Sequence, residues 1–203
     1  MDDSVGAIRA ELKTDDKEGT IREMAAALGV EARGPERPGV LDAAGYVRLE
    51  AGPWSALVSV AGPAPAYQPG HAHSEALSIE LSRDGRRVIV NSGVSTYEKG
   101  PERMLQRQTA AHSTLRIDGE EQSELWASHR CGRRSSCSFR DSGGAPAGEH
   151  DGYSRLSGRP MHGRTLLVDD RRVVIEDRVT GGGEHLLEAF FHLHPEVSAR
   201  REE

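Results

Sequence analysis

Two histidines spaced two residues apart are the most chemically suggestive feature of this 203-residue sequence. His71 and His73 stand in the run Gly70-His71-Ala72-His73. Side chains two positions apart on a strand point to the same face of a sheet. The pair could therefore supply two metal ligands, or one ligand and one proton-transfer group. A bare H-x-H motif is more often structural or solvent-exposed, so the spacing alone leaves these alternatives open.

Further histidines bear on the same chemistry. His112 could supply a third nitrogen, although a lone histidine is more often a hydrogen-bonded surface residue. A second H-x-H motif at His192 and His194 has apolar neighbours, which favours a hydrogen-bonded structural role. We assign no role to the histidines in polar or turn-like contexts, which are His129, His150, His162 and His185.

Arginines concentrate in the middle of the chain, although the net charge is -6. A groove lined by several of them would bind carboxylate or sulfate groups through paired N–H donors. Arginines scattered over a solvated surface explain the same spacing equally well. The residues concerned are Arg103, Arg107, Arg116, Arg130, Arg133, Arg134 and Arg140.

Composition limits the class of protein. The 26 Lys and Arg residues are outnumbered by 32 Asp and Glu, which argues against a nucleic-acid partner. No apolar run approaches the ~18 residues of a membrane span, and the first residues lack signal-peptide features, which leaves the compartment open. Cys131 and Cys137 are too few for a disulfide framework. Nucleophile-elbow, Walker, dinucleotide-binding and HExxH motifs do not occur in the sequence.

Short β-prone runs bounded by glycine and proline dominate from about residue 41. Asp84-Gly85 predicts a type I′ hairpin turn, because both central residues of that turn need a positive φ. The pattern predicts an all-β, antiparallel β-sandwich of about ten strands. We expect strands at 45–49, 56–60, 76–81, 88–90, 114–117, 165–168, 173–175 and 185–194, and an exposed loop at 143–152.

Residues 1–40 have a different character. Thr20 and Glu23 form a capping-box pattern, and apolar residues then recur at helical spacing as far as Leu28. Gly29 is a suitable helix stop, and a Gly- and Pro-rich stretch follows at 34–39. We therefore expect a connector with a short N-terminal helix at 1–40, followed by one β-sandwich domain at 41–203.

Four runs in the middle of the chain, with one later run, resemble the C-terminal β-sandwich of the heparinase II/III-like polysaccharide lyases. They occur in the family's order and cover most of residues 41–197. The runs are Gln68–Ser78 (QPGHAHSEALS), Val90–Tyr97 (VNSGVSTY), Thr109–Thr114 (TAAHST), Asp118–Glu124 (DGEEQSE) and Phe191–Pro195 (FHLHP).

The resemblance implies an activity. Family members cleave acidic, uronate-containing polysaccharides by β-elimination, in which a base removes the C5 proton and an acid protonates the departing C4 oxygen. The resemblance implies that His71 is the catalytic histidine of this domain. It also implies an N-terminal α-helical toroid that supplies a Tyr and a carboxylate-neutralising Asn or Arg. The chain is too short to contain that domain, so we expect a fragment with little activity of its own.

The resemblance further implies a set of binding residues. His73, Asn91 and His112 correspond to ligands of a divalent metal, usually zinc, with a mainly structural role. We also expect Arg107 and Gln122 to contact the substrate. The family commonly has Asp at the position of Asn91, and a neutral amide oxygen is a poorer zinc ligand than a carboxylate.

The hairpin register sets a condition on this metal site. Closing the hairpin on Asp84-Gly85 pairs residues whose numbers sum to 169, so that Asn91 faces Ser78. His73 then lies on the opposite face of the strand. The two side chains can meet only if a bulge or a bend intervenes near residues 73–76.

Two other functions stay open at the sequence level. The H-x-H motif with Glu80, Gly85 and a later His112 resembles the cupin metal pattern, although the glutamate spacing is too long and the second cupin motif is absent. A non-catalytic carbohydrate-binding sandwich would use the arginine groove and Trp126 without chemistry.

Overall fold

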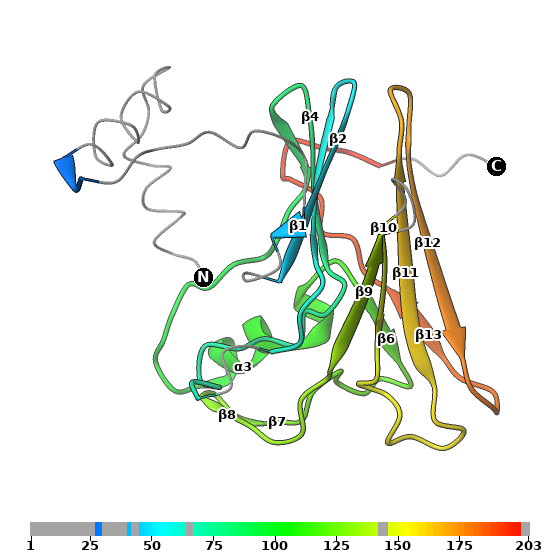
Figure 1. The fold of residues 1–203 in the computed structure, drawn as a ribbon. Coiled ribbons are helices and arrows are strands. Elements are labelled where there is room, and N and C mark those ends of the chain that lie inside the picture. The colour runs from blue at the N-terminus through cyan, green and yellow to red at the C-terminus, as the bar shows by residue number, and fades with distance from the viewer. Residues whose placement is uncertain (1–26, 30–39, 42–44, 64–66, 142–145, 200–203) are drawn as a thin grey trace.

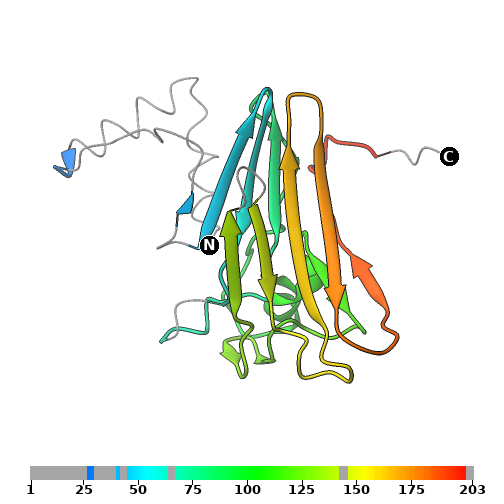
Figure 2. The same ribbon diagram turned by 45° about the vertical axis from the view of Figure 1, so that its right-hand side comes forward.

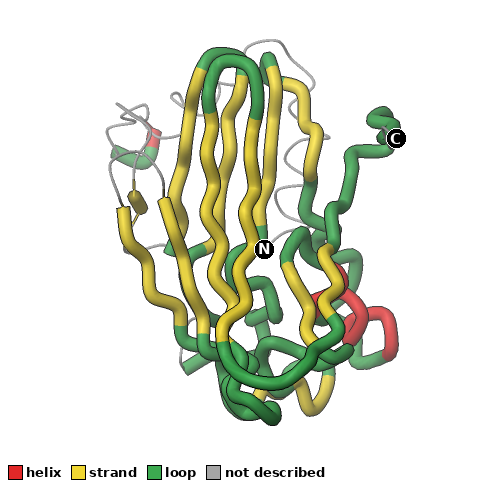
Figure 3. Tube along the Cα trace, turned by 90° about the vertical axis from the view of Figure 1, so that its right-hand side faces the viewer, coloured by secondary structure: helices red, strands yellow, loops and turns green. Residues whose placement is uncertain are grey.

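Two antiparallel sheets form the body of the molecule. The computed structural model describes residues 27–29, 40–41, 45–63, 67–141 and 146–199. A five-stranded sheet has the order β1-β2-β3-β4-β5, a four-stranded sheet has the order β12-β11-β10-β9, and β13–β6 and β7–β8 are two smaller pairs. The two larger sheets face each other as two layers (Figures 1 and 2), and Figure 3 shows their strands face-on.

The first sheet comprises β1 (Val40–Leu41), β2 (Tyr46–Ala51), β3 (Trp54–Ser59), β4 (Ile79–Arg83) and β5 (Arg86–Ile89). The second comprises β9 (Cys137–Asp141), β10 (Pro146–His150), β11 (Met161–Val168) and β12 (Val173–Thr180). The remaining elements are α3 (Pro101–Arg107), the 3₁₀ turn η2 (Thr109–Ala111), β6 (Leu115–Ile117), β7 (Leu125–Ala127), β8 (Arg130–Cys131) and β13 (Leu187–Ala189).

Apolar alternation builds the core between the two sheets. Every second residue of the central strands points inward, so Val58, Ile79, Leu81 and Ile89 of the first sheet pack with Leu166 of β11. Partly buried aliphatic residues of β11 and β12 complete this cluster. The predicted antiparallel β-sandwich is confirmed, and because its strands form open sheets rather than a barrel, the fold does not support the cupin alternative.

The predicted hairpin between β4 and β5 is confirmed. Asp84 and Gly85 have φ values of 49° and 73°, as a type I′ turn requires. The predicted register holds for Arg83 with Arg86, but Leu81 pairs with Ile89, because a bulge shifts the ladder by one residue.

Two sequence expectations are wrong. Within the expected loop at 143–152, residues 146–150 form strand β10, which pairs with β9 and β11 and places His150 fully inside. The expected strand at 185–194 is divided, since only Leu187–Ala189 pairs with β6, whereas His192 and His194 bond to the backbone beside β5. One segment therefore serves two sheets, which needs a bend that an uninterrupted strand would not allow.

The predicted N-terminal helix falls mostly outside the described residues. Gly29 is described, and its φ of 68° fits the predicted helix stop. Among the described residues, no helix combines the length and apolar character needed to cross a membrane.

Candidate functional site

The loop that carries His71 is fastened by two buried arginines of helix α3. Arg103 and Arg107 lie one helical turn apart, and both are 0% exposed. Arg103 donates to the carbonyl of Gly70 at 3.1 Å, and Arg107 donates to the carbonyls of Pro69 and Ala72 at 2.9 and 2.8 Å. Because these bonds lie on both sides of His71, the loop has little freedom to move.

His71 itself is exposed and stands against an aromatic ring. Its imidazole lies 5.4 Å from the ring of Tyr97, centroid to centroid, and the guanidinium of Arg103 lies 5.0 Å from the centroid of that ring. The carbonyl of Tyr97 also lies 2.9 Å from Nε2 of His129. Tyr97 thus links the exposed histidine to the buried arginine, a role that sequence reasoning did not assign.

The three predicted metal ligands lie together. Nδ1 of His73 is 3.3 Å from Nε2 of His112, and Nδ1 of His112 is 3.0 Å from Oδ1 of Asn91. Both histidines are buried. Burial, with neighbouring His112 and Arg103, lowers the pKa of His73 to about 2, and burial lowers the pKa of His112 to about 3. Both imidazoles are therefore neutral at pH 7.

A bend satisfies the condition that the hairpin register imposed. Strand β4 begins only at Ile79, and residues Glu75 to Ser78 form a turn closed by a 3.0 Å bond from the amide of Ser78 to the carbonyl of Glu75. Leu77 has a φ of 58°, which is uncommon for a residue with a side chain. This turn redirects the chain before the strand, so that His73 and Asn91 both reach His112.

The arrangement does not fit a three-ligand zinc centre. His73 and Asn91 contact opposite nitrogens of the His112 ring, so they do not converge on one point. Arg103 places NH1 3.0 Å from Nε2 of His73, and a guanidinium only donates hydrogen bonds. Among the described residues, no group of three or more His, Cys, Asp or Glu side chains is placed to hold a metal ion. The zinc site that the resemblance implied therefore remains untested, and elemental analysis of the purified protein would test it.

The two predicted substrate contacts are buried. Arg107 also donates hydrogen bonds to the carbonyls of Ala127 and Arg130, which connects the β7–β8 hairpin to the His71 loop. Gln122 is 1% exposed, and its amide nitrogen lies 3.1 Å from the carbonyl of Ala76. These positions favour a role in holding the site together. Direct contact with substrate stays a prediction.

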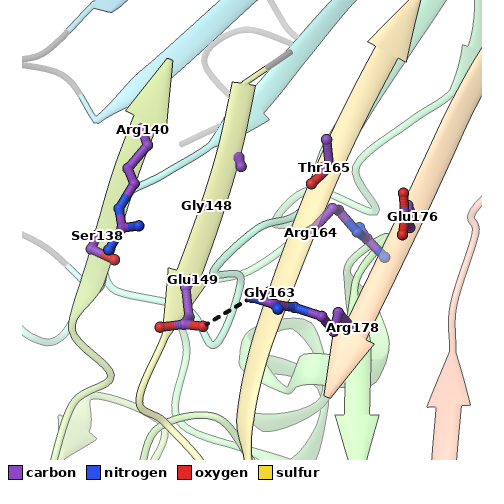
Figure 4. Close-up of a pocket in the computed structure, with 10 residues that line it drawn as sticks. Ser138, Arg140, Gly148, Glu149, Gly163, Arg164, Thr165, Glu176 and Arg178 are labelled. Atoms are coloured by element: carbon purple, nitrogen blue, oxygen red, sulfur yellow. Dashed lines mark ion pairs between the residues drawn. The ribbon is translucent and has the colours of Figure 1, made fainter. Parts of the chain in front are cut away.

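The seven arginines do not all line one exposed groove, which was one of the two alternatives left open by their spacing, because Arg103 and Arg107 are buried. Besides the two buried arginines of α3, Arg116 pairs with Glu188, and Arg133 pairs with Asp151. Arg140 instead lines a groove of about 420 Å³ over strands β9 to β12, where Figure 4 shows it near Gly148 and Ser138. The groove contains none of the predicted site residues.

A second buried pair of histidines, to which we assigned no role from their sequence contexts, lies in the second sheet. His150 and His162 face each other across β10 and β11, with Nε2 of His150 3.1 Å from Nδ1 of His162. Nε2 of His162 lies 2.8 Å from Asp177, which Arg164 holds with two bonds of 2.7 and 2.9 Å. Arg164 also donates to the carbonyl of Ser113, the residue after His112. No sequence motif marks these two histidines. They meet because β10 pairs with β11, so the pair could be found only after β10 had been recognised as a strand.

The fold and the histidine cluster define an antiparallel β-sandwich domain with one exposed histidine on a fixed loop. The family model for the heparinase II/III-like C-terminal domain matches residues 33–203, and the chain belongs to this family. No curated protein matches the chain.

Two solved structures show the same fold. A heparinase III gene product has 21% identity and a TM-score of 0.60, and the match covers 97% of this chain and 30% of that one. A heparan sulfate lyase, HepC from Pedobacter heparinus, has 18% identity and a TM-score of 0.59, covering 93% of this chain and 29% of that one. This chain thus spans less than a third of the length of these solved structures.

Proposed function

We propose that this chain supplies the histidine-bearing domain of a polysaccharide lyase that cleaves an acidic, uronate-containing polysaccharide by β-elimination. The observation that carries the proposal is the exposed imidazole of His71 on a loop held by two buried arginines. Membership of the heparinase II/III-like family and the fold shared with a heparan sulfate lyase support it.

In the proposed reaction, a base removes the proton at C5 of the uronate, and the C5 electron pair forms the C4–C5 double bond. The C4 oxygen leaves with the bond electrons and takes a proton from an acid. An imidazole exchanges protons near neutral pH, so His71 suits one of these transfers. Its ring is held between solvent and Tyr97, which limits the orientations in which it meets the sugar.

The uronate carboxylate must be neutralised to acidify C5. The predicted substrate contact on this chain, Arg107, is buried and bonded to backbone carbonyls. We therefore propose that the neutralising group and a second proton-transfer group come from an N-terminal α-toroid domain in a longer protein. The reading frame upstream of Met1 identifies that protein, and several hundred mostly helical residues encoded there would support this division.

The experiment compares an acidic and a neutral polysaccharide. The longer protein and the isolated chain are each incubated with heparan sulfate and, separately, with a neutral glycan. The unsaturated uronate product is read by its near-ultraviolet absorbance, and total cleavage is read by the new reducing ends. We expect product only from heparan sulfate or another uronate polymer, and little or none from the 203 residues alone. Robust cleavage of the neutral glycan by the isolated chain would refute the proposal.

A non-catalytic carbohydrate-binding role is the alternative, and exposed aromatic rings favour it. Trp126 and Tyr67 are 69% and 86% exposed, and aromatic faces of this kind can stack on sugar rings. His71→Ala separates the two functions. In a lyase the variant keeps binding but loses turnover, whereas in a binding module the wild-type protein has no turnover to lose.

A further inference from the structure

Five side chains form one continuous hydrogen-bonded line through the predicted metal site. The line runs from Arg103 through His73, His112 and Asn91 to Glu75. Its last bond joins Nδ2 of Asn91 to the Glu75 carboxylate at 3.3 Å. The line connects helix α3, the His71 loop, the turn after η2 and the segment after β5.

The donors and acceptors along this line fix every proton. Arg103 only donates, so Nε2 of His73 accepts and the proton of this neutral ring is on Nδ1. The N–H at Nδ1 of His73 donates a hydrogen bond to Nε2 of His112. The single N–H of the neutral His112 ring is therefore on Nδ1. Nδ1 of His112 then donates to Oδ1 of Asn91. The assignment leaves no unused lone pair on either imidazole.

A metal ion would need the lone pairs that this line already uses. A neutral imidazole has one lone pair, so His73 cannot accept from Arg103 at Nε2 and bind a cation at Nδ1 at once. Metal-bound histidines instead donate their second N–H to a carboxylate or carbonyl, the opposite polarity. Asn91 adds no negative charge, and the Arg103 cation beside His73 repels a second cation.

We infer that this cluster is a metal-independent strut, in which the Arg103 guanidinium joins the His71 loop to His112. Arg103 contacts His73 and the carbonyl of Gly70, on either side of His71. Asn91 is part of the same strut. Its amide accepts a hydrogen bond from His112 and donates one to Glu75, and an ionised carboxylate could not donate. The inference concerns the chain itself and is independent of the proposed function.

Metal content and histidine tautomers test the inference on the wild-type chain. After exposure to excess zinc and dialysis, we expect no stoichiometric zinc by elemental analysis, and a thermal midpoint that shifts by less than about 1 °C with zinc or chelator. Long-range ¹H–¹⁵N NMR should show His73 and His112 neutral, each with its proton on Nδ1. About one zinc per chain, lost to chelator together with a fall in the midpoint, would overturn the inference. An Nε2–H tautomer at either ring would overturn it too.

Two variants separate the contributions of Asn91 and Arg103. Asn91→Asp alone restores a carboxylate but leaves Arg103 on His73, so we expect zinc binding to stay absent. Asn91→Asp with Arg103→Met frees the lone pair of His73. If the His112 ring then turns so that the three donors meet, zinc uptake should rise above that of the single variant, with a higher thermal midpoint in zinc. Stoichiometric zinc in the single variant would show that Arg103 does not exclude the metal. If the double variant does not fold, the tautomers of the wild-type chain still decide the matter.

Discussion

At the scale of single residues, the exposed residue of the site is available to a substrate, and the buried residues hold it in position. His71 presents its imidazole to solvent, whereas Arg103 and Arg107 are fully buried and bond to the backbone on both sides of it. The sequence runs singled out His71, His73 and His112, and the structure brings His73 and His112 together. The burial of Arg103 and Arg107 was not predictable, because most of their hydrogen-bond partners are backbone carbonyl groups, which carry no sequence signature.

Arg107→Lys tests this role of the buried residues. A lysine keeps the charge but has no planar fork, so it cannot reach four carbonyls at once. Carbonyl groups left buried without donors cost free energy, and we expect a loss of about 2–4 kcal/mol in the free energy of unfolding, measured by urea denaturation. Arg130→Lys is the matched control, since its side chain is exposed, and it should cost less than about 0.5 kcal/mol. Equal stability of the two variants would contradict the account.

At the scale of elements, the turn before β4 determines which side chains meet. Leu77 is fully buried with a φ of 58°, and it fills the space above Gly148 of β10. The turn allows His73 and Asn91 to approach His112 although they lie on opposite sides of a regular hairpin register. The predicted hairpin register showed that a bend was needed before β4, and Asp84-Gly85 correctly indicated the position of the hairpin turn. The sequence did not indicate that the bend is at Leu77, because leucine has no preference for a positive φ.

A pair of small substitutions tests the packing of this turn on the second sheet. A methyl group added at Gly148 would overlap Cδ2 of Leu77, so Gly148→Ala should destabilise the chain by about 1–3 kcal/mol. Leu77→Ala should cost about 2–5 kcal/mol on its own. The double variant should lose at least ~1 kcal/mol less than the sum, because the smaller side chain makes room for the methyl group.

Gly163→Ala is the control for this pair, because a methyl group there would meet its nearest neighbour at an ordinary 3.5 Å. We expect a change within about 1 kcal/mol. Strict additivity of the Leu77 and Gly148 substitutions would show that the two residues do not share one packing site.

β10 shows why part of the fold was not predictable. Pro146–His150 contains no alternation of apolar and polar residues, and its strand character comes from pairing with β9 on one side and β11 on the other. Such non-local pairing overrides weak local propensity. Missing β10 also hid His150 and His162, which meet only in the register of that ladder.

At the scale of the whole molecule, neutral buried histidines make the free energy of unfolding depend on pH. Burial lowers the pKa of both His150 and His162 below 6.5. The unfolded chain takes up their protons as pH falls below 6.5 while the folded chain does not, so stability is complete above that pH and is lost below it. Hydrogen bonds from His162 and Arg164 lower the pKa of Asp177 against the effect of burial, so its contribution is lost only below about pH 3.8.

His162→Gln tests this coupling. Each buried histidine steepens the pH dependence by up to ~1.4 kcal/mol per pH unit, and the variant should flatten the slope between pH 6.5 and 5 by about that amount. Urea denaturation at several pH values measures the slope. His71→Gln is the control, because it replaces an exposed histidine and removes no buried imidazole. A variant slope equal to that of the wild type would contradict the assignment of His162 as a neutral buried group.

We propose that His71 transfers a proton in the cleavage of a uronate-containing polysaccharide. The most direct measurement compares the longer protein that contains this chain with its His71→Ala variant, by the near-ultraviolet absorbance of the unsaturated product. We expect the variant to lose at least ~10²-fold in turnover and to retain its thermal midpoint and its affinity for the polysaccharide. A variant that keeps the wild-type rate would contradict the claim.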